Sequence, residues 1–274
     1  YTQRLNLSGD TELASEELSS IPETLVSMKL GGYGCLRVAT YLFPEAAGEL
    51  SWIFIILAST AILYGAIVTL RQKDLKYMNA FSSVSHCGFV ILGIAMLTRT
   101  AITGAVMQMV SHGVMTALFF GVIGMIYQRT HTRQISELGG VLYQAPFIGS
   151  AFLIAGLCSL GLPGMSGFVS EMTIFVGSWE RTGTFYRVAT LIACSSIVIT
   201  AVYILRAVGS VIWGEVRNKA VKTMTDATPA EKLASVLLVA AIFLIGTCPF
   251  WVIRLIDSDS LAIAQRLLTQ AFQY

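Results

Sequence analysis

Apolar residues fall in long blocks along this chain, each about 20 residues in length and separated from the next by a short polar segment. A helix of that length spans the hydrocarbon core of a bilayer. The pattern predicts an all-α, polytopic membrane helix bundle of about seven transmembrane helices. The expected spans cover residues 22–43, 50–70, 77–97, 101–127, 146–179, 188–213 and 233–253.

The fifth block, 146–179, is too long for one straight crossing and contains Leu162-Pro163-Gly164 near its middle. Proline lacks an N–H and clashes with the preceding turn of a helix. We therefore expect this helix to be broken at Leu162-Pro163-Gly164. The block pattern also divides the chain into a polar leader (1–20), the transmembrane bundle (21–255) and a C-terminal tail (256–274).

Composition agrees with a membrane protein. Hydrophobic residues make up 55% of the 274 positions and charged residues only 12%, about half the charge of a typical soluble domain. The net charge is +2, which gives no basic surface for nucleic acid.

Basic residues mark three of the connecting loops. If every apolar block crosses the membrane once, these loops all lie on one side of it. The positive-inside rule places that side in the bacterial cytoplasm or the mitochondrial matrix. The basic residues are Arg71, Lys73 and Lys76; Arg129 and Arg133; and Arg217, Lys219 and Lys222.

Ionisable residues inside the predicted spans are candidates for function, because each costs several kcal/mol to place in the membrane core. Five stand out: Lys29, His86, His112, Glu171 and Arg206. Arg206 keeps its charge, so we expect a fixed counter-ion rather than a proton carrier. The other four are predicted to transfer protons.

Each histidine lies on a polar stripe of its helix. Asn79, Ser82 and Ser83 share a helical face with His86, and Gln108, Ser111 and Thr116 share one with His112. Such stripes line hydrated paths or join helices by hydrogen bonds. A histidine also accepts and releases protons near neutral pH, so we favour a proton-transfer function for His86 and His112.

Glu171 and Lys29 each have a structural alternative. Glu171 follows the predicted helix break, where irregular backbone lines a cavity or is buried in protein, but it could instead form a structural salt bridge. Lys29 lies early in its span, where burial lowers the pKa of an ammonium. It could instead extend to the membrane surface.

Motifs of other chemistries are missing from the sequence. The five cysteines are scattered, with no CxxC or Cys/His cluster, so we expect no metal site. No P-loop, GxSxG or HExxH motif occurs.

Five strings carry a family resemblance: KLGGYGCLR (29–37), TLRQKDLKYMNAFSSVSHCGF (69–89), GAVMQMVSHGVMTALFF (104–120), YQRTHTRQISELGG (127–140) and SLGLPGMSGFVSEMTIFVGSW (159–179). In unbroken order from Lys29 to about Glu215, they resemble the antiporter-like membrane subunit of respiratory complex I (NADH:quinone oxidoreductase), known as subunit 4 or the M-type subunit. Those subunits contain two inverted five-helix repeats, and this chain resembles the second repeat with flanking helices, the C-terminal half.

The resemblance implies roles for the candidate residues. Lys29 matches the central bridging lysine and His86 the histidine of the SVSH motif. His112 matches the histidine of the HG motif, and Glu171 the terminal carboxylate beside the second broken helix. The implied function is proton translocation driven by quinone reduction elsewhere in the complex.

The resemblance also implies partners. NADH, FMN, Fe–S clusters and quinone are expected in other subunits, with no cofactor in this chain. We expect other complex I membrane subunits as neighbours, a separate chain that supplies the missing first repeat, and lipid. The alternatives are a subunit of a multisubunit cation/proton antiporter or membrane-bound hydrogenase, and a structural half-subunit that moves no ions.

Overall fold

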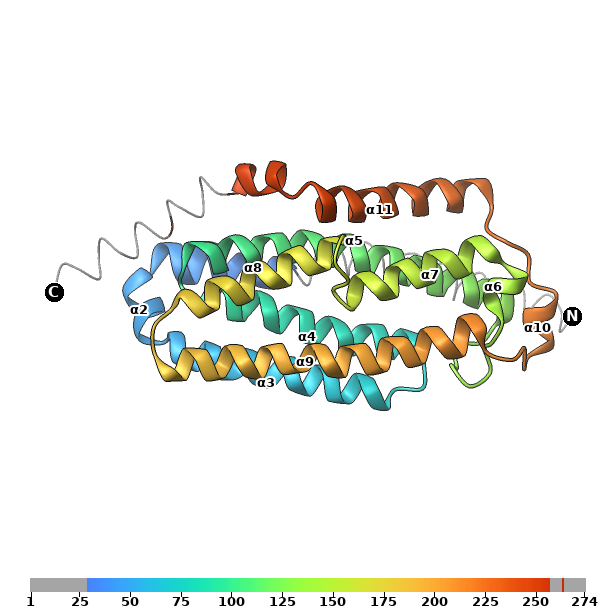
Figure 1. Ribbon diagram of the computed structural model, residues 1–274, viewed down its shortest axis with the longest axis horizontal. Helices are drawn as coiled ribbons and strands as arrows, with labels where there is room; N and C mark the ends of the chain where they lie inside the picture. The colour runs from blue at the N-terminus through green and yellow to red at the C-terminus, as the bar shows by residue number, and fades with distance from the viewer. Residues whose placement is uncertain (1–28, 257–262, 264–274) are drawn as a thin grey trace, which may run out of the picture.

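The computed structural model describes residues 29–256 and residue 263, and its described part is an all-α bundle, as predicted. The long helices run nearly parallel or antiparallel to one another along the longest axis of the molecule (Figure 1). The α-helices of the described part are α2 (Pro44–Glu49), α3 (Ser51–Arg71), α4 (Leu75–Ala95), α5 (Arg99–Thr130), α6 (Val141–Gln144), α7 (Pro146–Ser159), α8 (Ser166–Glu180), α9 (Thr184–Val208), α10 (Lys219–Lys222) and α11 (Pro229–Thr247), of which α2, α6 and α10 are short.

Five helices in the described part are long and apolar enough to cross a membrane: α3, α4, α5, α11, and α9 with the π-helical turn η2 (Gly209–Trp213). The pair α7 and α8 supplies a sixth crossing in two pieces. Residues 29–42 are helical and include a π-helical turn, η1 (Cys35–Thr40). They belong to the first predicted span, whose earlier residues lie outside the described part, as do the leader 1–20 and nearly all of the tail 256–274.

The last predicted span is interrupted where we expected a continuous helix to residue 253. The helix α11 ends at Thr247, and helical structure resumes at Phe250. Cys248 has φ −125° and ψ 59°, because the ring of a following proline excludes the helical conformation from the residue before it. Pro249 is that proline, and the sequence prediction gave it too little weight.

The break between α7 and α8 is the one predicted at Leu162-Pro163-Gly164, and α7 ends there in a Schellman motif. The N–H of Leu162 donates to the carbonyl of Leu157 at 3.1 Å, and the N–H of Gly161 to that of Cys158 at 3.1 Å. Gly161 takes the left-handed conformation that this turn needs, with φ 74°. The chain therefore leaves α7 with its last carbonyls bonded.

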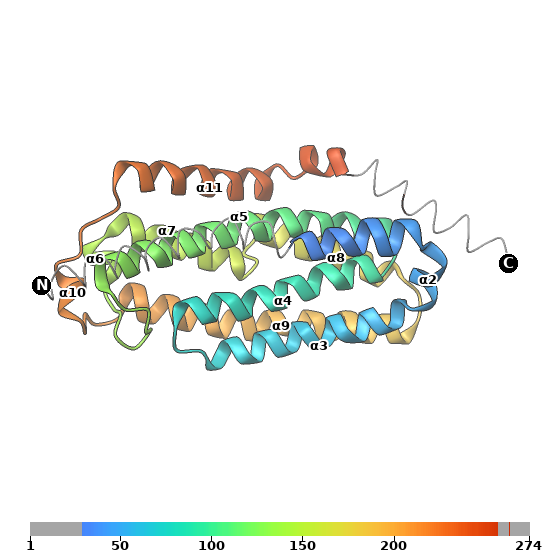
Figure 2. The same ribbon diagram turned by 180° about the vertical axis from the view of Figure 1, so that it is seen from behind.

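Small residues bring the helices close together. A Cβ added to Gly65 of α3 would lie 2.7 Å from the backbone nitrogen of Ser85 in α4. One added to Gly104 of α5 would lie 2.7 Å from the backbone nitrogen of Ile174 in α8. Close backbone approach through small residues is typical of membrane helix interfaces. Figure 2 shows α3 and α4 side by side.

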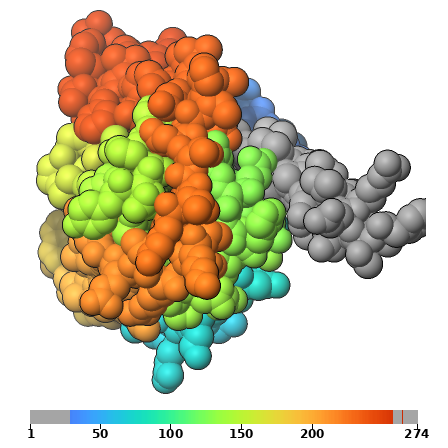
Figure 3. All heavy atoms as spheres, turned by 90° about the vertical axis from the view of Figure 1, so that its right-hand side faces the viewer, coloured from blue at the N-terminus to red at the C-terminus, as the bar shows by residue number. Residues whose placement is uncertain are grey.

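The three basic loops lie together at one end of the bundle, as the sequence predicted. The N–H of Leu75 donates to the carbonyl of Arg133 at 3.0 Å, and that of Ile135 to Lys73 at 2.8 Å. Arg217 donates to the carbonyl of Ser136 at 3.0 Å. Figure 3 views this end, hereafter the basic end, where the orange segment that includes α10 lies against the green segment of α6.

Arg181 holds the helices together at the opposite end. Its guanidinium donates to the carbonyls of Ala95 at 2.9 Å and Met96 at 3.1 Å, at the C-terminus of α4. It also donates to the Ser51 hydroxyl at 3.3 Å, at the start of α3. A cation near the C-terminus of a helix complements its dipole, so Arg181 ties α3 and α4 to the connection between α8 and α9.

Candidate functional site

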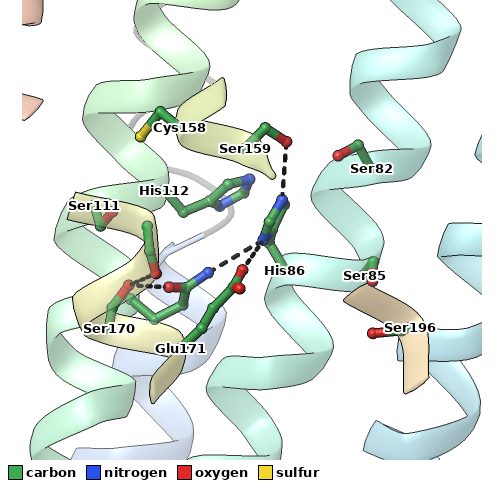
Figure 4. A network of polar contacts seen from close by, with 12 residues as sticks. Ser82, Ser85, His86, Ser111, His112, Cys158, Ser159, Ser170, Glu171 and Ser196 are labelled. Carbon is green, nitrogen blue, oxygen red and sulfur yellow. Dashed lines mark hydrogen bonds and ion pairs between the residues drawn. The ribbon is translucent and has the colours of Figure 1, made fainter. Parts of the chain in front are cut away.

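A cluster of buried polar side chains lies at mid-height in the bundle, beside the helix break (Figure 4). Here α4, α5 and α8 meet the last residue of α7. Three of the four predicted proton-transfer residues belong to it, with exposed fractions of 3% for His86, 2% for His112 and 5% for Glu171. We call this set, with Gln108, Ser159 and Ser170, the central cluster.

His86 is the centre of the cluster. Its Nδ1 lies 3.3 Å from Oε1 of Glu171 and 3.2 Å from Nε2 of Gln108, and its Nε2 lies 3.3 Å from the Ser159 hydroxyl. A carboxylate accepts a hydrogen bond from a protonated Nδ1, whereas an amide N–H donates a hydrogen bond to an unprotonated one. The two neighbours of Nδ1 therefore favour different protonation states of His86.

Gln108 is held in the orientation that directs its amide nitrogen at His86. The Ser170 hydroxyl donates a hydrogen bond to Gln108 Oε1. Both groups are fully buried, at 0% and 1% exposed. With its oxygen occupied by that donor, the amide presents N–H to Nδ1, which stabilises the form of His86 with an unprotonated Nδ1.

His112 stands next to His86 but has its own partner. The two rings are 5.1 Å apart between centroids with an angle of 34° between their planes. His112 Nε2 lies 3.2 Å from the Ser83 hydroxyl, one helical turn before His86 on α4. The sequence predicted both histidines on polar stripes, and the structure places these two stripes against each other.

Glu171 packs against the turn that breaks the helix. A Cβ added to Gly161 would lie 2.9 Å from Oε2 of Glu171. Gly161 therefore has two structural roles. It adopts the left-handed conformation of the turn, and its lack of a side chain leaves room for the Glu171 carboxylate. The Glu171 carboxylate therefore lies beside the helix break.

A second polar contact extends from the cluster toward the basic end. The hydroxyl of Tyr203 in α9 is 2.9 Å from that of Ser82, one turn before His86, and Tyr203 is 3% exposed. Tyr203 was not predicted from the sequence, and neither were Ser159 and Ser170. Single hydroxyl residues in apolar helices carry no local signal of which neighbour they face.

Lys29 approaches the cluster from the helical segment 29–42. It is half-buried, and its ammonium lies within electrostatic range of Cys87 and His112. Gly32, one turn later, allows this approach, because a Cβ there would lie 2.9 Å from the sulfur of Met109. Lys29 therefore faces the same helices, α4 and α5, that carry the two histidines.

Arg206 does not join the central cluster. It lies exposed in the last turn of α9 and lines a separate cavity at the basic end. Within the described residues, no group of three or more His, Cys, Asp or Glu side chains is arranged to hold a metal ion.

The arrangement of the central cluster permits proton exchange. Glu171 and His86 are in contact and buried, so a proton on either group can pass to the other without crossing water. Two further hydrogen-bonding groups, Ser159 and Gln108, connect to the same imidazole. Fold and cluster together define an integral membrane helical bundle with an acid–base pair at its core.

The chain belongs to the NADH:quinone oxidoreductase/Mrp antiporter transmembrane family, whose model matches residues 18–200. Subunit M of the NADH-quinone oxidoreductase of Rickettsia prowazekii is 37% identical over 88% of this chain and 48% of its own length. Chain 4 1 of the NAD(P)H-quinone oxidoreductase of Synechococcus elongatus is 35% identical over 88% of this chain and 46% of its own length. The chain thus spans about half the length of these relatives.

Solved structures share the fold. Respiratory complex I from Thermus thermophilus contains a chain that matches with a TM-score of 0.80 and 29% identity, over 87% of this chain and 50% of that one. A chain of the Mrp complex from Dietzia sp. matches with a TM-score of 0.76 and 18% identity, over 89% of this chain and 53% of that one. The second match is informative about the fold alone.

Proposed function

We propose that this chain supplies part of the proton path of a membrane subunit of a complex I-like NADH:quinone oxidoreductase. One observation carries the proposal: a buried Glu171–His86 pair beside a broken helix, within a chain whose curated relatives are named as subunits of that enzyme. A buried carboxylate and imidazole in contact would have little reason to persist in a lipid-embedded core without a function.

The proposed roles follow the contacts. Glu171 and His86 exchange a proton, and Gln108 stabilises the state in which Nδ1 of His86 is free. His112 and Lys29 extend the path along α5 and the helical segment 29–42. NADH, FMN, Fe–S clusters and quinone belong to other subunits in this proposal, and the chain itself performs no redox chemistry.

The substitution Glu171→Gln tests this function. We expect proton uptake coupled to NADH oxidation, measured in vesicles containing the assembled complex, to fall about tenfold or more. Glu180→Gln is the matched control, since Glu180 ends the same helix, is exposed and accepts only from Thr100 among its described contacts. If the Glu171→Gln variant kept full proton uptake, the proposal would fail. The alternative that this chain is a structural half-subunit that moves no ions would then be preferred.

A cation/proton antiporter remains the second candidate, because the matching family also includes Mrp antiporters. The higher identity to the quinone-oxidoreductase relatives ranks it second. Sodium-dependent ion flux without a quinone-linked partner would support it. Proton uptake that is independent of sodium and requires quinone reduction would exclude it.

Other membrane subunits are proposed as partners. These partners are further membrane chains of the same multisubunit complex. Mass spectrometry of the material that copurifies from native membranes tests this, and recovery without any such chain would contradict it. The proposed location is the bacterial cytoplasmic or mitochondrial inner membrane, with the basic end facing the cytoplasm or matrix.

A further inference from the structure

A cavity of about 270 Å³ lies at the basic end between the ends of α3, α4 and α9. Polar and basic side chains line much of it. Lys73 comes from the connection between α3 and α4, Arg206 from the last turn of α9, and Arg217 from the segment after η2. None of the residues in the proposed proton path lines this basic cavity.

The three cations of the basic cavity have no acidic partner within the described part of the chain. No carboxylate lines the cavity. The nearest acid in sequence to Lys73 is Asp74, which is engaged by Arg133 at 3.6 Å and by the backbone N–H of Lys76 at 2.8 Å. Three positive charges converge here without neutralisation, so the basic cavity is complementary to an anion.

The surroundings of Arg206 place the basic cavity at the level of lipid headgroups. Leu205 is 53% exposed and Val202 is 51% exposed on the same helix, and Trp213 is 51% exposed at the end of η2. Exposed leucine and valine in a membrane helix contact acyl chains, whereas tryptophan concentrates at the headgroup interface. Arg206 therefore lies where an apolar helix surface reaches the membrane boundary.

A π-helical turn contributes to the cavity wall. The helix α9 continues into the π-helical turn η2, and Ser210 of that turn lines the basic cavity. Single π-helical turns are frequently found at functional sites. A hydroxyl and three cations together match the oxygen atoms of a phosphodiester, which arginine binds through paired N–H donors.

We propose that the basic cavity binds the phosphate of an anionic phospholipid, with the acyl chains lying along the exposed apolar residues of α9. A soluble phosphate would satisfy the cations but not these apolar residues. Basic pockets between transmembrane helices on the cytoplasmic or matrix side are known to hold anionic headgroups. The proposal does not depend on the proton path.

Lipid titration of the purified complex, followed by native mass spectrometry, tests the proposal. We expect phosphatidylglycerol to bind at least fivefold more tightly than zwitterionic phosphatidylcholine. Arg206→Gln should weaken phosphatidylglycerol binding about fivefold, and adding Lys73→Gln should weaken it by about the same factor again. Arg206→Lys, which keeps the charge, should retain most of the binding and shows that loss in Arg206→Gln is not unfolding.

Arg71→Gln is the matched control, because Arg71 is exposed at the end of α3 but does not line the basic cavity. If Arg71→Gln weakened phosphatidylglycerol binding as much as Arg206→Gln does, the proposal would be overturned. That result would show only that the basic end as a whole attracts anionic lipid. Equal binding of both lipids would also overturn it. Binding of inorganic phosphate in place of phosphatidylglycerol would assign the cavity to a soluble anion.

Discussion

The Nδ1 atom of His86 faces two groups that prefer opposite protonation states. Gln108 donates to an unprotonated Nδ1, and Glu171 accepts from a protonated one. The presence or absence of a proton on Nδ1 decides which of these two contacts is stronger. The cluster therefore has two hydrogen-bonding arrangements, which differ by the transfer of one proton to or from His86. Such a pair is suited to passing protons, whereas a permanent salt bridge would hold one arrangement.

Gln108→Leu should therefore impair proton transfer more than stability. The variant removes the donor to Nδ1, while the Ser170 hydroxyl can turn to donate to the carbonyl of Ser166 or Gly167 instead. We expect NADH-driven proton uptake to fall about tenfold, with assembly unchanged. Gln128→Leu, exposed on the same helix, is the control, and equal effects of both variants would contradict a specific role for Gln108.

Gly161→Ala should combine backbone strain with a collision. A left-handed residue other than glycine costs about 1–2 kcal/mol, and the new methyl group would lie 2.9 Å from Oε2 of Glu171. We expect a lower thermal midpoint in detergent and reduced proton uptake.

Gly164→Ala separates the two effects. Gly164 is also left-handed, with φ 94°, but nothing lies within 4 Å of its added Cβ. We expect this variant to lose stability and keep proton uptake in proportion to folded protein. Equal loss of proton uptake per folded molecule in both variants would show that the contact with Glu171 is immaterial.

The residues of the central cluster differ in how far the sequence foretold them. His86, His112 and Glu171 were predicted because an ionisable group in an apolar span is rare and its cost is large. Ser159 and Ser170 could not be predicted, since their roles depend on which helices pack together. Single-sequence periodicity gives the face of a helix but not its neighbour.

The helix ends at the basic end are secured by side chains distant in sequence. Asp226, before α11, accepts from the backbone N–H groups of Phe147 at 3.4 Å and Ile148 at 3.3 Å, in the first turn of α7. It acts on α7 as an N-cap residue does. Burial alone would raise the pKa of Asp226, but the N–H groups of Ala227, Ile148 and Phe147, with the nearby Lys232 ammonium, hold it below its ordinary value.

Asp226→Ala should destabilise the protein by about 1 kcal/mol at neutral pH. A depressed pKa means that the carboxylate stabilises the folded state above its unfolded-state pKa and stops doing so as pH falls through the folded-state value. The difference in thermal midpoint between the variant and the unsubstituted protein should therefore shrink as the pH is lowered below about 4. A constant difference across pH, or an equal effect of the exposed control Glu215→Ala, would contradict this role.

At the scale of elements, the broken helix and the grouping of basic loops followed directly from Pro163 and from the spacing of Lys and Arg. The interruption at Pro249 was missed because the apolar run continues through it. Apolar content shows that a segment lies in the membrane, but only the backbone restrictions of proline show where its helix stops.

For the whole molecule, the proposed orientation can be measured by labelling. A Lys222→Cys variant places a thiol at the basic end, and a Glu49→Cys variant places one at the opposite end, where each native residue is exposed. A membrane-impermeant maleimide should label the first in inverted vesicles and the second in right-side-out vesicles. The unsubstituted protein gives the background from the five native cysteines, and the reversed pattern would overturn the orientation.

Both ends of the bundle are pinned. Arg181 fixes one end, and at the other the backbone pairs of the basic loops act together with the Arg129–Glu231 ion pair of 2.8 Å. These contacts fix the helices at both ends of the bundle. The pair α7 and α8 differs from the continuous helices because its backbone is interrupted near its middle. A small axial displacement of Glu171 relative to His86 can be taken up within residues 160–165, while the helices around it stay in register.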